Sequence, residues 1–288
     1  MKMAELFENK KTVFSLEIFP PKKDAGGIET IYETLDGLKD IKPDFISVTY
    51  GAGGNLADNS TCEICSIIKE KYNILPIAHL TCVHNSKEDI DVIWNNLQNA
   101  GISNVLALRG DINPDIPSKD DFKHANELIT YLKSKGDVNI SAACYPEGHP
   151  ESDGDLVADI LNLKHKVDCG AEHLMSQLFF DNKDFYDFRE KAKLAGINVP
   201  IEAGIMPVTS KSQVLRMASM CGASIPSKLS RILNRFGDDQ QALEDAGIAY
   251  AIDQIIDLIA NGVDGIHLYT MNKPHVAQKI FKAIESMR

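Results

Sequence analysis

Eight short apolar runs, rich in β-branched residues, recur along this chain. They are Thr12–Phe19, Phe45–Tyr50, Ile77–Cys82, Asn104–Asp111, Ile140–Pro146, His173–Phe180, Ile201–Val208 and Gly265–Met271. Most begin about 30 residues apart, which is the length of one strand–helix–strand unit. The sixth and seventh runs are almost continuously apolar, as is typical of parallel strands that are buried on both faces. The repetition predicts an α/β protein with a parallel sheet.

Helical periodicity fills the intervals between the runs. Apolar residues at three- and four-residue spacing predict helices over Ile28–Lys39, Asn59–Lys71, Lys87–Ala100, Asp121–Ser134, Asp153–Asp168 and Lys183–Ala195. The longer interval after the seventh run holds two extra elements, Ser210–Cys221 and Pro226–Arg235, before a long helix Gln240–Asn261. A last helix begins near Pro274. Eight such units favour a (β/α)8 TIM barrel over an open doubly wound sheet. No linker interrupts residues 1–288, so we expect a single catalytic domain.

Charge and cysteine usage narrow the classes of function. The formal net charge of −11 argues against broad binding to nucleic acid or to an anionic membrane, because both need a basic face. Cys62 and Cys65 form a CxxC without a second pair, whereas a zinc or iron–sulfur site needs about four ligands. We therefore expect no metal and six reduced thiols. The N-terminus has no apolar signal core, and no membrane-spanning run follows, so we expect a cytoplasmic protein.

Polar side chains gather at the C-terminal ends of the runs. They are Glu17, Tyr50, His79, Arg109, Asp111, Tyr145, His149, Gln177 and Tyr269. In a barrel these ends form one rim, where active sites lie. Strand alternation places Glu17 on the same face as Val13 and Ser15. A buried carboxyl group favours its protonated form, so Glu17 is a candidate general acid. The alternative is a structural glutamate that pairs with Arg or Lys at the barrel mouth.

Two glycine-containing segments end the fourth and the second runs. In Arg109-Gly110-Asp111 the glycine permits close approach to a ligand, and a cation and an anion flank it. This favours ligand binding over an Arg–Asp pair that only shapes the turn. Segment 49–54, TYGAGG, can cradle a phosphate. It lacks the G-x-G-x-x-G spacing and the Walker lysine, however, so an ordinary turn explains it equally well.

The fifth and sixth runs are followed by further candidates. Segment 145–150, YPEGHP, could bind a metal or do acid–base chemistry, or it could be a rigid proline turn. Asp159, Asn162 and Lys166 share one helix face, which faces either solvent or a ligand. Gln177 interrupts an apolar strand, where a buried amide needs hydrogen-bond partners from a ligand or from the core.

In this order the segments resemble the bacterial methylenetetrahydrofolate reductase family. The matching strings are SLEIFPPK, FISVTYGAGG, AHLTC, NVLALRGD, AACYPEGHPES, DILNLKHKVDCGA, SQLFFD, GIMPV and HLYTMNK. They span residues 13–273, and together they are far more specific than any one of them. The resemblance implies a flavin-dependent barrel that reduces 5,10-methylenetetrahydrofolate to 5-methyltetrahydrofolate in one-carbon metabolism and methionine biosynthesis.

The resemblance also implies a reaction scheme and residue roles. Hydride passes from NADH to FAD, NAD leaves, and the folate takes the hydride in the same space, in ping-pong order. Glu17 matches the general acid, Asp111 a carboxylate near the flavin, and Gln177 a contact of both folate and nicotinamide. The matches to FAD contacts are Thr49, Tyr50, Ala52, His79, Arg109, Gly110, Asp111, His124, Ala143, His149, Asp159, Asn162 and Lys166. Those on the substrate side are Glu17, Gln177, Gln213, Tyr269 and Lys273.

The chain departs from the family pattern at two positions. His124 stands where the family often has a tyrosine by the flavin, and Met217 where a phenylalanine can pack on the substrates. Methionine can also pack on rings. Family members are often homo-oligomers, and some receive electrons within larger complexes. We therefore expect a folate and a nicotinamide nucleotide as partners, a homo-oligomer, and an electron-delivering subunit as the alternative donor.

Two other classes of function stay open from the residues alone. One is a metal-dependent or Schiff-base lyase, with candidates His79, Asp111, Glu147 and His149. No lysine lies among the strand ends near Glu17, however, and no ligand trio is obvious. The other is a non-catalytic subunit that kept the barrel. The presence of Glu17, Asp111 and Gln177 together argues against it.

Overall fold

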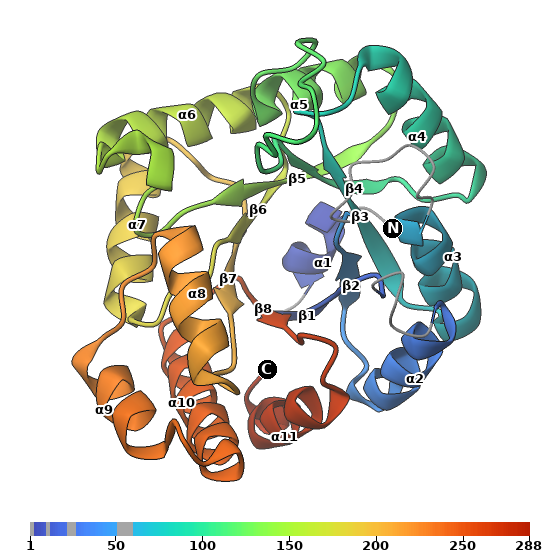
Figure 1. Ribbon diagram of the computed structural model, residues 1–288. Helices are drawn as coiled ribbons and strands as arrows, with labels where there is room; N and C mark the ends of the chain where they lie inside the picture. The colour runs from blue at the N-terminus through green and yellow to red at the C-terminus, as the bar shows by residue number, and fades with distance from the viewer. Residues whose placement is uncertain (1–2, 10–11, 22–26, 51–59) are drawn as a thin grey trace.

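Eight parallel strands close into one barrel in the computed structural model, which describes residues 3–9, 12–21, 27–50 and 60–288. The strands are β1 (Val13–Ile18), β2 (Phe45–Val48), β3 (Leu75–Thr81), β4 (Asn104–Leu108), β5 (Asn139–Cys144), β6 (His173–Ser176), β7 (Ile201–Ile205) and β8 (Gly265–Tyr269). Strand β1 pairs with both β2 and β8, which closes the sheet, and helices surround it (Figure 1). The predicted (β/α)8 barrel is confirmed.

The outer helices follow the predicted order. They are α2 (Glu29–Leu38), α3 (Ser60–Tyr72), α4 (Lys87–Asn99), α5 (Ala125–Ser134), α6 (Leu156–Asp168), α7 (Asn182–Leu194), α8 (Lys211–Cys221), α9 (Ser227–Phe236), α10 (Gln240–Ala260) and α11 (Pro274–Ile284). Short 3-10 helices are η1 (Lys39–Ile41), η2 (Pro150–Ser152) and η3 (Glu285–Met287). The two extra elements predicted between the seventh and eighth strands are α8 and α9, and α10 follows them.

Two helices begin later than their apolar pattern predicts. Helix α6 begins at Leu156, because the Asp155 carboxylate accepts a hydrogen bond from the Ala158 N–H at 2.9 Å and so caps the helix there. Helix α5 begins at Ala125, and Glu127 accepts from the His124 N–H at 3.3 Å. In both cases a local side-chain cap, and not the apolar spacing, decides the first turn.

A short helix that the sequence pattern did not predict covers the N-terminal end of the barrel. Helix α1 (Met3–Asn9) buries Met3 and Leu6, and the Phe7 ring stacks on the His173 imidazole with centroids 4.8 Å apart. Figure 1 shows α1 in the centre of the barrel view. Seven residues are too few to display a helical period. This helix leaves the opposite, C-terminal rim as the place for a site.

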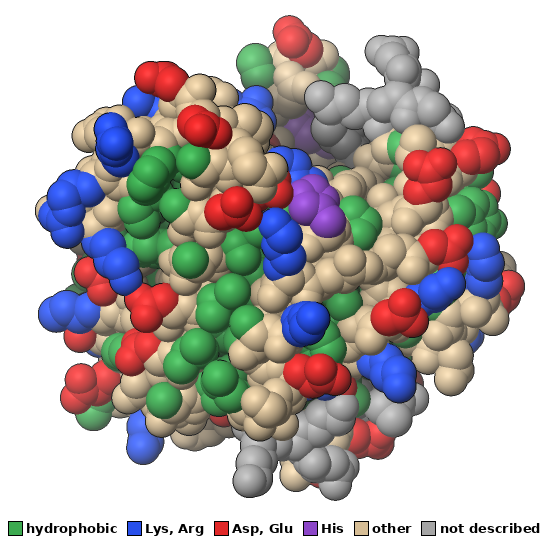
Figure 2. Space-filling view, turned by 90° about the horizontal axis from the view of Figure 1, so that it is seen from below, with side chains coloured by type: hydrophobic (Ala, Val, Ile, Leu, Met, Phe, Trp, Pro, Cys, Tyr) green, Lys and Arg blue, Asp and Glu red, His purple; other side chains and the backbone are tan. Residues whose placement is uncertain are grey.

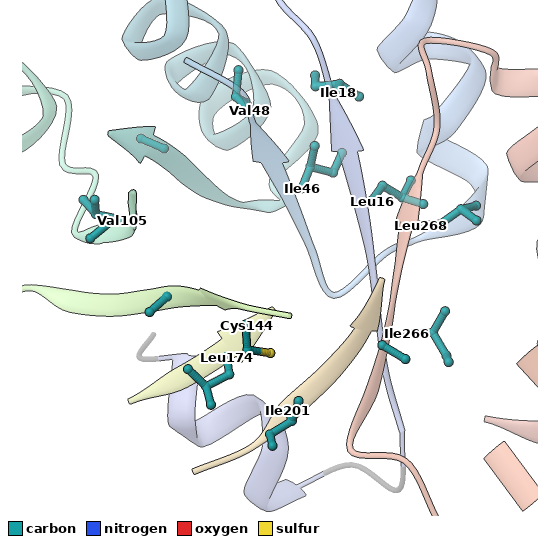
Figure 3. Close-up of a cluster of buried hydrophobic side chains, with 14 of the residues drawn as sticks. Leu16, Ile18, Ile46, Val48, Val105, Cys144, Leu174, Ile201, Ile266 and Leu268 are labelled. Carbon is teal, nitrogen blue, oxygen red and sulfur yellow. The ribbon is translucent and has the colours of Figure 1, made fainter. Parts of the chain in front are cut away.

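Strand alternation separates two apolar layers. The side chains of Leu16, Ile18, Ile46 and Val48 point away from the barrel axis into the main core beneath the helices (Figure 3). Val13 points inward with a smaller cluster at the barrel floor. Fully burying one such aliphatic side chain contributes about 1.5–3 kcal/mol relative to exposing it. Glu17 shares the inward face of β1 with Val13, as the strand alternation predicts.

The outer surface carries both signs of charge. Acidic and basic side chains are interspersed on the face shown in Figure 2. Exposed ion pairs include Lys228–Asp253 at 2.6 Å and Lys279–Asp245 at 3.2 Å. All six cysteines are free thiols, as predicted. Within the described ranges, no helix has the length and apolar character needed to cross a bilayer.

Candidate active site

Two adjoining cavities open at the C-terminal rim of the barrel. The larger, of about 550 Å³, lies over the barrel axis and reaches Glu17. The smaller, of about 480 Å³, lies beside α6, next to the ends of β4 and β5. Both are lined by Leu108, Arg109, Ala143, Tyr145 and His149. A ligand longer than either cavity could therefore extend across the shared wall.

Most of the predicted site residues line these cavities. The larger is lined by Glu17, Thr49, Tyr50, His79, Gly110, Asp111, Gln177 and Tyr269, and also by Met217. The smaller is lined by His124, Asp159, Asn162 and Lys166, and both are lined by Arg109, Ala143 and His149. Gln213 and Lys273 line neither cavity, and the Lys273 ammonium instead donates to Thr209 Oγ1 at 3.0 Å. Ala52 lies outside the described residues.

Glu17 lies at the base of the larger cavity with imidazole neighbours. Its side chain is 8% exposed, and its Oε2 is 3.5 Å from the Nε2 atoms of both His79 and His267. In the structural alternative Glu17 would pair with an arginine or a lysine, whereas here two histidines lie beside it. Burial lowers the pKa of His79 to about 4, although the Glu17 carboxyl acts in the opposite direction. His79 is therefore neutral near pH 7, and its contact with Glu17 is not an ion pair.

The buried neutral state of His79 predicts a pH-dependent stability. The unfolded chain binds a proton on this imidazole below its ordinary pKa of 6.5, and the folded protein does so only below about 4. The folded state therefore loses stability as the pH falls through this window, by about 2.5 kcal/mol between pH 7.5 and 4.5. In His79→Gln the difference between the free energies of unfolding at these two pH values should shrink by that amount.

Urea titrations of the ligand-free protein at both pH values test this expectation. The exposed histidine control is His275→Gln, whose side chain is 55% exposed in the parent. An unchanged pH difference in His79→Gln would show that folding does not lower the pKa of His79.

The Arg109–Asp111 turn has geometry that suits an anion. Gly110 has φ +87°, and a Cβ there would lie 2.9 Å from Thr81 Cβ, so another residue would be strained and crowded. The Arg109 guanidinium donates to both carboxylate oxygens of Glu151, at 2.6 and 2.8 Å. This contact raises the pKa of Arg109 and lowers that of Glu151. The side-chain partner of Arg109 is therefore Glu151, and not Asp111 as in the disfavoured turn-shaping alternative. Glu151, half exposed, can be exchanged for a ligand anion.

Helix α6 presents a half-buried cation to the smaller cavity. Lys166 Nζ donates to the Ala143 carbonyl at 3.0 Å, and desolvation lowers the pKa of this ammonium. On the same helix, Asp159 Oδ2 accepts from the His149 N–H at 2.6 Å and from Ser152 Oγ at 2.8 Å. The polar face of α6 that carries Asp159, Asn162 and Lys166 thus lines a cavity and holds a loop. It is not the fully solvated helix face of the alternative.

Neutral hydrogen-bonding groups complete the rim. The Gln177 N–H donates to the Cys144 carbonyl at 2.7 Å, and the Gln177 side-chain oxygen accepts from the Leu178 N–H at 2.8 Å. The Tyr269 hydroxyl donates to the Ser176 carbonyl at 2.9 Å. Burial raises the pKa of Tyr269 well above its usual value, so the group stays a neutral phenol. Because the Gln177 side-chain oxygen already accepts from Leu178, the side-chain N–H groups of Gln177 are the donors that can serve a ligand.

Segment 145–150 is organised as a structural turn. The Glu147 carboxylate accepts from the Ser224 N–H at 2.9 and 3.1 Å, which ties this loop to the segment between α8 and α9. His149 Nδ1 accepts from the Glu151 N–H at 3.2 Å. In the described part of the chain, no three His, Cys, Asp or Glu side chains are grouped so that they could hold a metal ion.

Sequence reasoning missed several polar residues of the site. His84 Nε2 accepts from the Asn113 N–H at 3.1 Å and so supports the loop that carries Asp111. Beneath Glu17, the barrel interior holds His173, Glu202 and His267, all almost completely buried. The signal that singled out Glu17, a polar residue within an apolar strand, is also present at these three positions.

Comparison with known proteins agrees with this geometry. Residues 2–285 match the family model described as methylenetetrahydrofolate reductase. The chain is 36% identical to a 5,10-methylenetetrahydrofolate reductase of Pectobacterium carotovorum, over 92% of this chain and 88% of that protein. It is 37% identical to methylenetetrahydrofolate reductase (NADH) 1 of Arabidopsis thaliana, over 94% of this chain but only 48% of that protein.

A solved structure shares the fold at low sequence identity. It is an uncharacterized protein from Clostridium thermocellum that binds two copies of 5-methyl-5,6,7,8-tetrahydrofolic acid. The TM-score is 0.60 at 14% identity, and the alignment covers 100% of this chain and 99% of that one. The family match over nearly the whole length, and not this fold likeness, carries the assignment: the chain belongs to the methylenetetrahydrofolate reductase family.

Proposed function

We propose that this chain catalyses the flavin-dependent reduction of 5,10-methylenetetrahydrofolate to 5-methyltetrahydrofolate, with NADH as electron donor and in ping-pong order. Family membership supports the overall reaction. The observation that carries the mechanism is the position of Glu17, a nearly buried carboxyl group at the base of a cavity that Asp111 and Gln177 also line. A general acid, a carboxylate and an amide thus face one space.

The described residues fit FAD at the two cavities. Arg109 and Lys166 place two cations at the smaller cavity of a protein with a net charge of −11, and a diphosphate needs such counter-charges. The backbone at Gly110 leaves no room for a side chain and lets a ligand approach. When bound, a flavin would supply reversible acceptance and donation of a hydride. The diphosphate would replace Glu151 as the partner of Arg109.

The protein's own groups then have separate tasks in the larger cavity. Glu17 holds the proton that opens the methylene bridge of the folate. Neutral His79 beside it adds no positive charge that would stabilise the ionised carboxylate and so favour loss of this proton. Gln177 orients either the nicotinamide or the folate, because its amide can donate and accept. One cavity of about 550 Å³ for both substrates is consistent with ping-pong order. We also propose homo-oligomers, with an electron-delivering subunit as the alternative to NADH.

The visible spectrum of the purified protein during anaerobic NADH addition tests this function. We expect flavin bands near about 370 and 450 nm that bleach as NADH is added. Bands that persist would contradict NADH as the donor and keep the flavin. A protein without flavin bands that also fails to take up added FAD would overturn the proposed function.

A further inference from the structure

A line of buried polar side chains runs through the barrel interior from Glu17 toward the floor. It comprises Ser15 of β1, His267 of β8, Glu202 of β7 and His173 of β6, each at most 1% exposed. The proposed reaction uses none of these four groups directly. A fully buried carboxyl group such as that of Glu202 is costly unless it has partners, so its placement needs an explanation.

A series of polar contacts runs from Glu202 to Glu17. Ser15 Oγ donates to Glu202 Oε1 at 2.9 Å and lies 2.7 Å from His267 Nδ1. The other nitrogen of that ring, His267 Nε2, is 3.5 Å from Glu17 Oε2. At the far end, Glu202 Oε2 is 3.1 Å from His173 Nε2, at ion-pair distance but without hydrogen-bond geometry. His173 provides the polar partner for the buried carboxylate.

The barrel reserves space for the Glu202 side chain. Glu202 pairs in register with Gly265 of β8, and a Cβ on Gly265 would lie 2.6 Å from Glu202 Cγ and 2.8 Å from its Oε1. A glycine is therefore required beside this carboxylate. The Phe7 ring of α1 stacks on His173 from below. The carboxylate is thus enclosed between the apolar floor and Ser15.

The direction of these hydrogen bonds follows from what each group can do. Glu202 Oε1 accepts the proton of the Ser15 hydroxyl. The Ser15 proton is then used, and the short contact with His267 requires Nδ1–H to donate to Ser15 Oγ. With its one ring proton on Nδ1, His267 presents the lone pair of Nε2 toward Glu17 and toward Ser47 Oγ, which lies 3.5 Å away. That lone pair can accept a hydrogen bond from a protonated Glu17, whereas it would repel an ionised one.

We propose that Glu202 is a positioning residue that holds His267 in the Nδ1–H tautomer and thereby keeps the acid proton on Glu17. This inference rests on the proposed function, in which Glu17 is the general acid. The titratable groups that face Glu17 are His79 of β3 and His267 and Tyr269 of β8, and the group that faces Glu202 is His173 of β6. Among the described residues, the Ser15–His267 connection links the two carboxyl groups.

The Glu202→Gln variant tests the proposal because it preserves shape and removes the obligatory acceptor. An amide can donate to Ser15, which frees the Ser15 proton for His267 Nδ1 and moves the imidazole proton to Nε2. Nitrogen-15 NMR of histidine-labelled protein reports which ring nitrogen carries the proton, with His267→Asn used to assign the signal. We expect Nδ1–H in the parent and Nε2–H in Glu202→Gln. The matched control is Glu244→Gln, since Glu244 contacts the exposed His275 at 3.0 Å.

Stopped-flow kinetics supply the second readout. In Glu202→Gln, an Nε2–H donor stabilises the ionised Glu17, so the folate half-reaction should slow by about ten-fold or more near pH 7.5. Its pH midpoint should move downward, and flavin reduction by NADH should change by less than about two-fold, since it needs no general acid. Ser15→Ala, which removes the connecting hydroxyl, should act in the same direction. If Glu202→Gln does not fold, Ser15→Ala is the variant that tests the proposal.

Three results would overturn the proposal. They are a parent His267 with a proton on Nε2, an unchanged tautomer and pH midpoint in the folded variants, or equal slowing of both half-reactions, which a structural role would produce. A parent that has the predicted tautomer but does not reduce the folate would contradict the proposed function and leave the hydrogen-bond assignment supported. The NMR measurement does not need bound flavin, so the two failures are distinguishable.

Discussion

Replacing Glu17 with glutamine should slow reduction of the folate by at least about 100-fold, while NADH still bleaches the flavin at close to the parent rate. General acids typically contribute about 10²–10⁴-fold, and the amide cannot protonate the substrate. Glutamine keeps the shape of this 8%-exposed side chain, so the cavity should persist. Only the half-reaction that needs the proton is affected, because hydride transfer from NADH to a flavin does not require Glu17 as an acid.

Anaerobic stopped-flow measurement of the two half-reactions separately is the appropriate test. Glu190→Gln, an exposed change of the same type on α7, is the control and should leave both rates unchanged. Equal losses in the two half-reactions of Glu17→Gln would indicate damage to the shared cavity. The role of Glu17 as the general acid would then be wrong.

Replacing Lys166 with methionine should raise the dissociation constant for FAD by about ten-fold or more. A hydrogen bond to a charged group is worth about 1.5–3 kcal/mol, and a phosphate is the anion that this half-buried ammonium would meet. Lys166 Nζ donates to the Ala143 carbonyl, so the cation already points into the smaller cavity. Methionine keeps the length of the stem and removes the cost of burying the charge. Folding should therefore tolerate the change.

Fluorescence titration of the flavin-free protein with FAD measures this effect. Lys164→Met is the matched control: Lys164 lies on the same helix but pairs with Asp168 at the surface. The difference between the two variants should narrow at high salt, because counter-charges are screened. Equal affinities for FAD in the two variants would place the diphosphate away from Lys166.

Much of the fold could be predicted from local patterns. All eight strands and the helices between them follow from the apolar spacing, since side chains in a strand repeat every two residues and those in a helix about every 3.6. Helix α1 was not predicted, because seven residues are too few to show a helical period of apolar residues. The first turns of α5 and α6 were misplaced for a different reason. There the side chains of Glu127 and Asp155 decide where the helix begins.

The candidate site was predictable as far as the strand-end rule reaches. That rule brought Glu17, Asp111 and Gln177 to one rim, and the structure places all three on one cavity. The strand-end rule did not predict which side chains contact each other. The disfavoured turn-shaping alternative would have paired Arg109 with Asp111, and the sequence named no other partner, whereas Arg109 contacts Glu151, 42 residues away along the chain. Gln213 and Lys273 line neither cavity. Pairing depends on where side chains of different strands and loops meet, and residue type alone does not specify it.

The amino-acid sequence by itself determined the barrel, its rim and the family, because periodicity and motif order are local properties that one chain displays in full. Only the tertiary structure decided that Ser15 contacts Glu202 and His267, which lie 187 and 252 residues further along the chain. Closure of the barrel between β1 and β8 creates these contacts. A closed sheet brings the two ends of the chain together, and it excludes water from the polar groups enclosed there. The proposed control of the Glu17 proton therefore belongs to the folded protein alone.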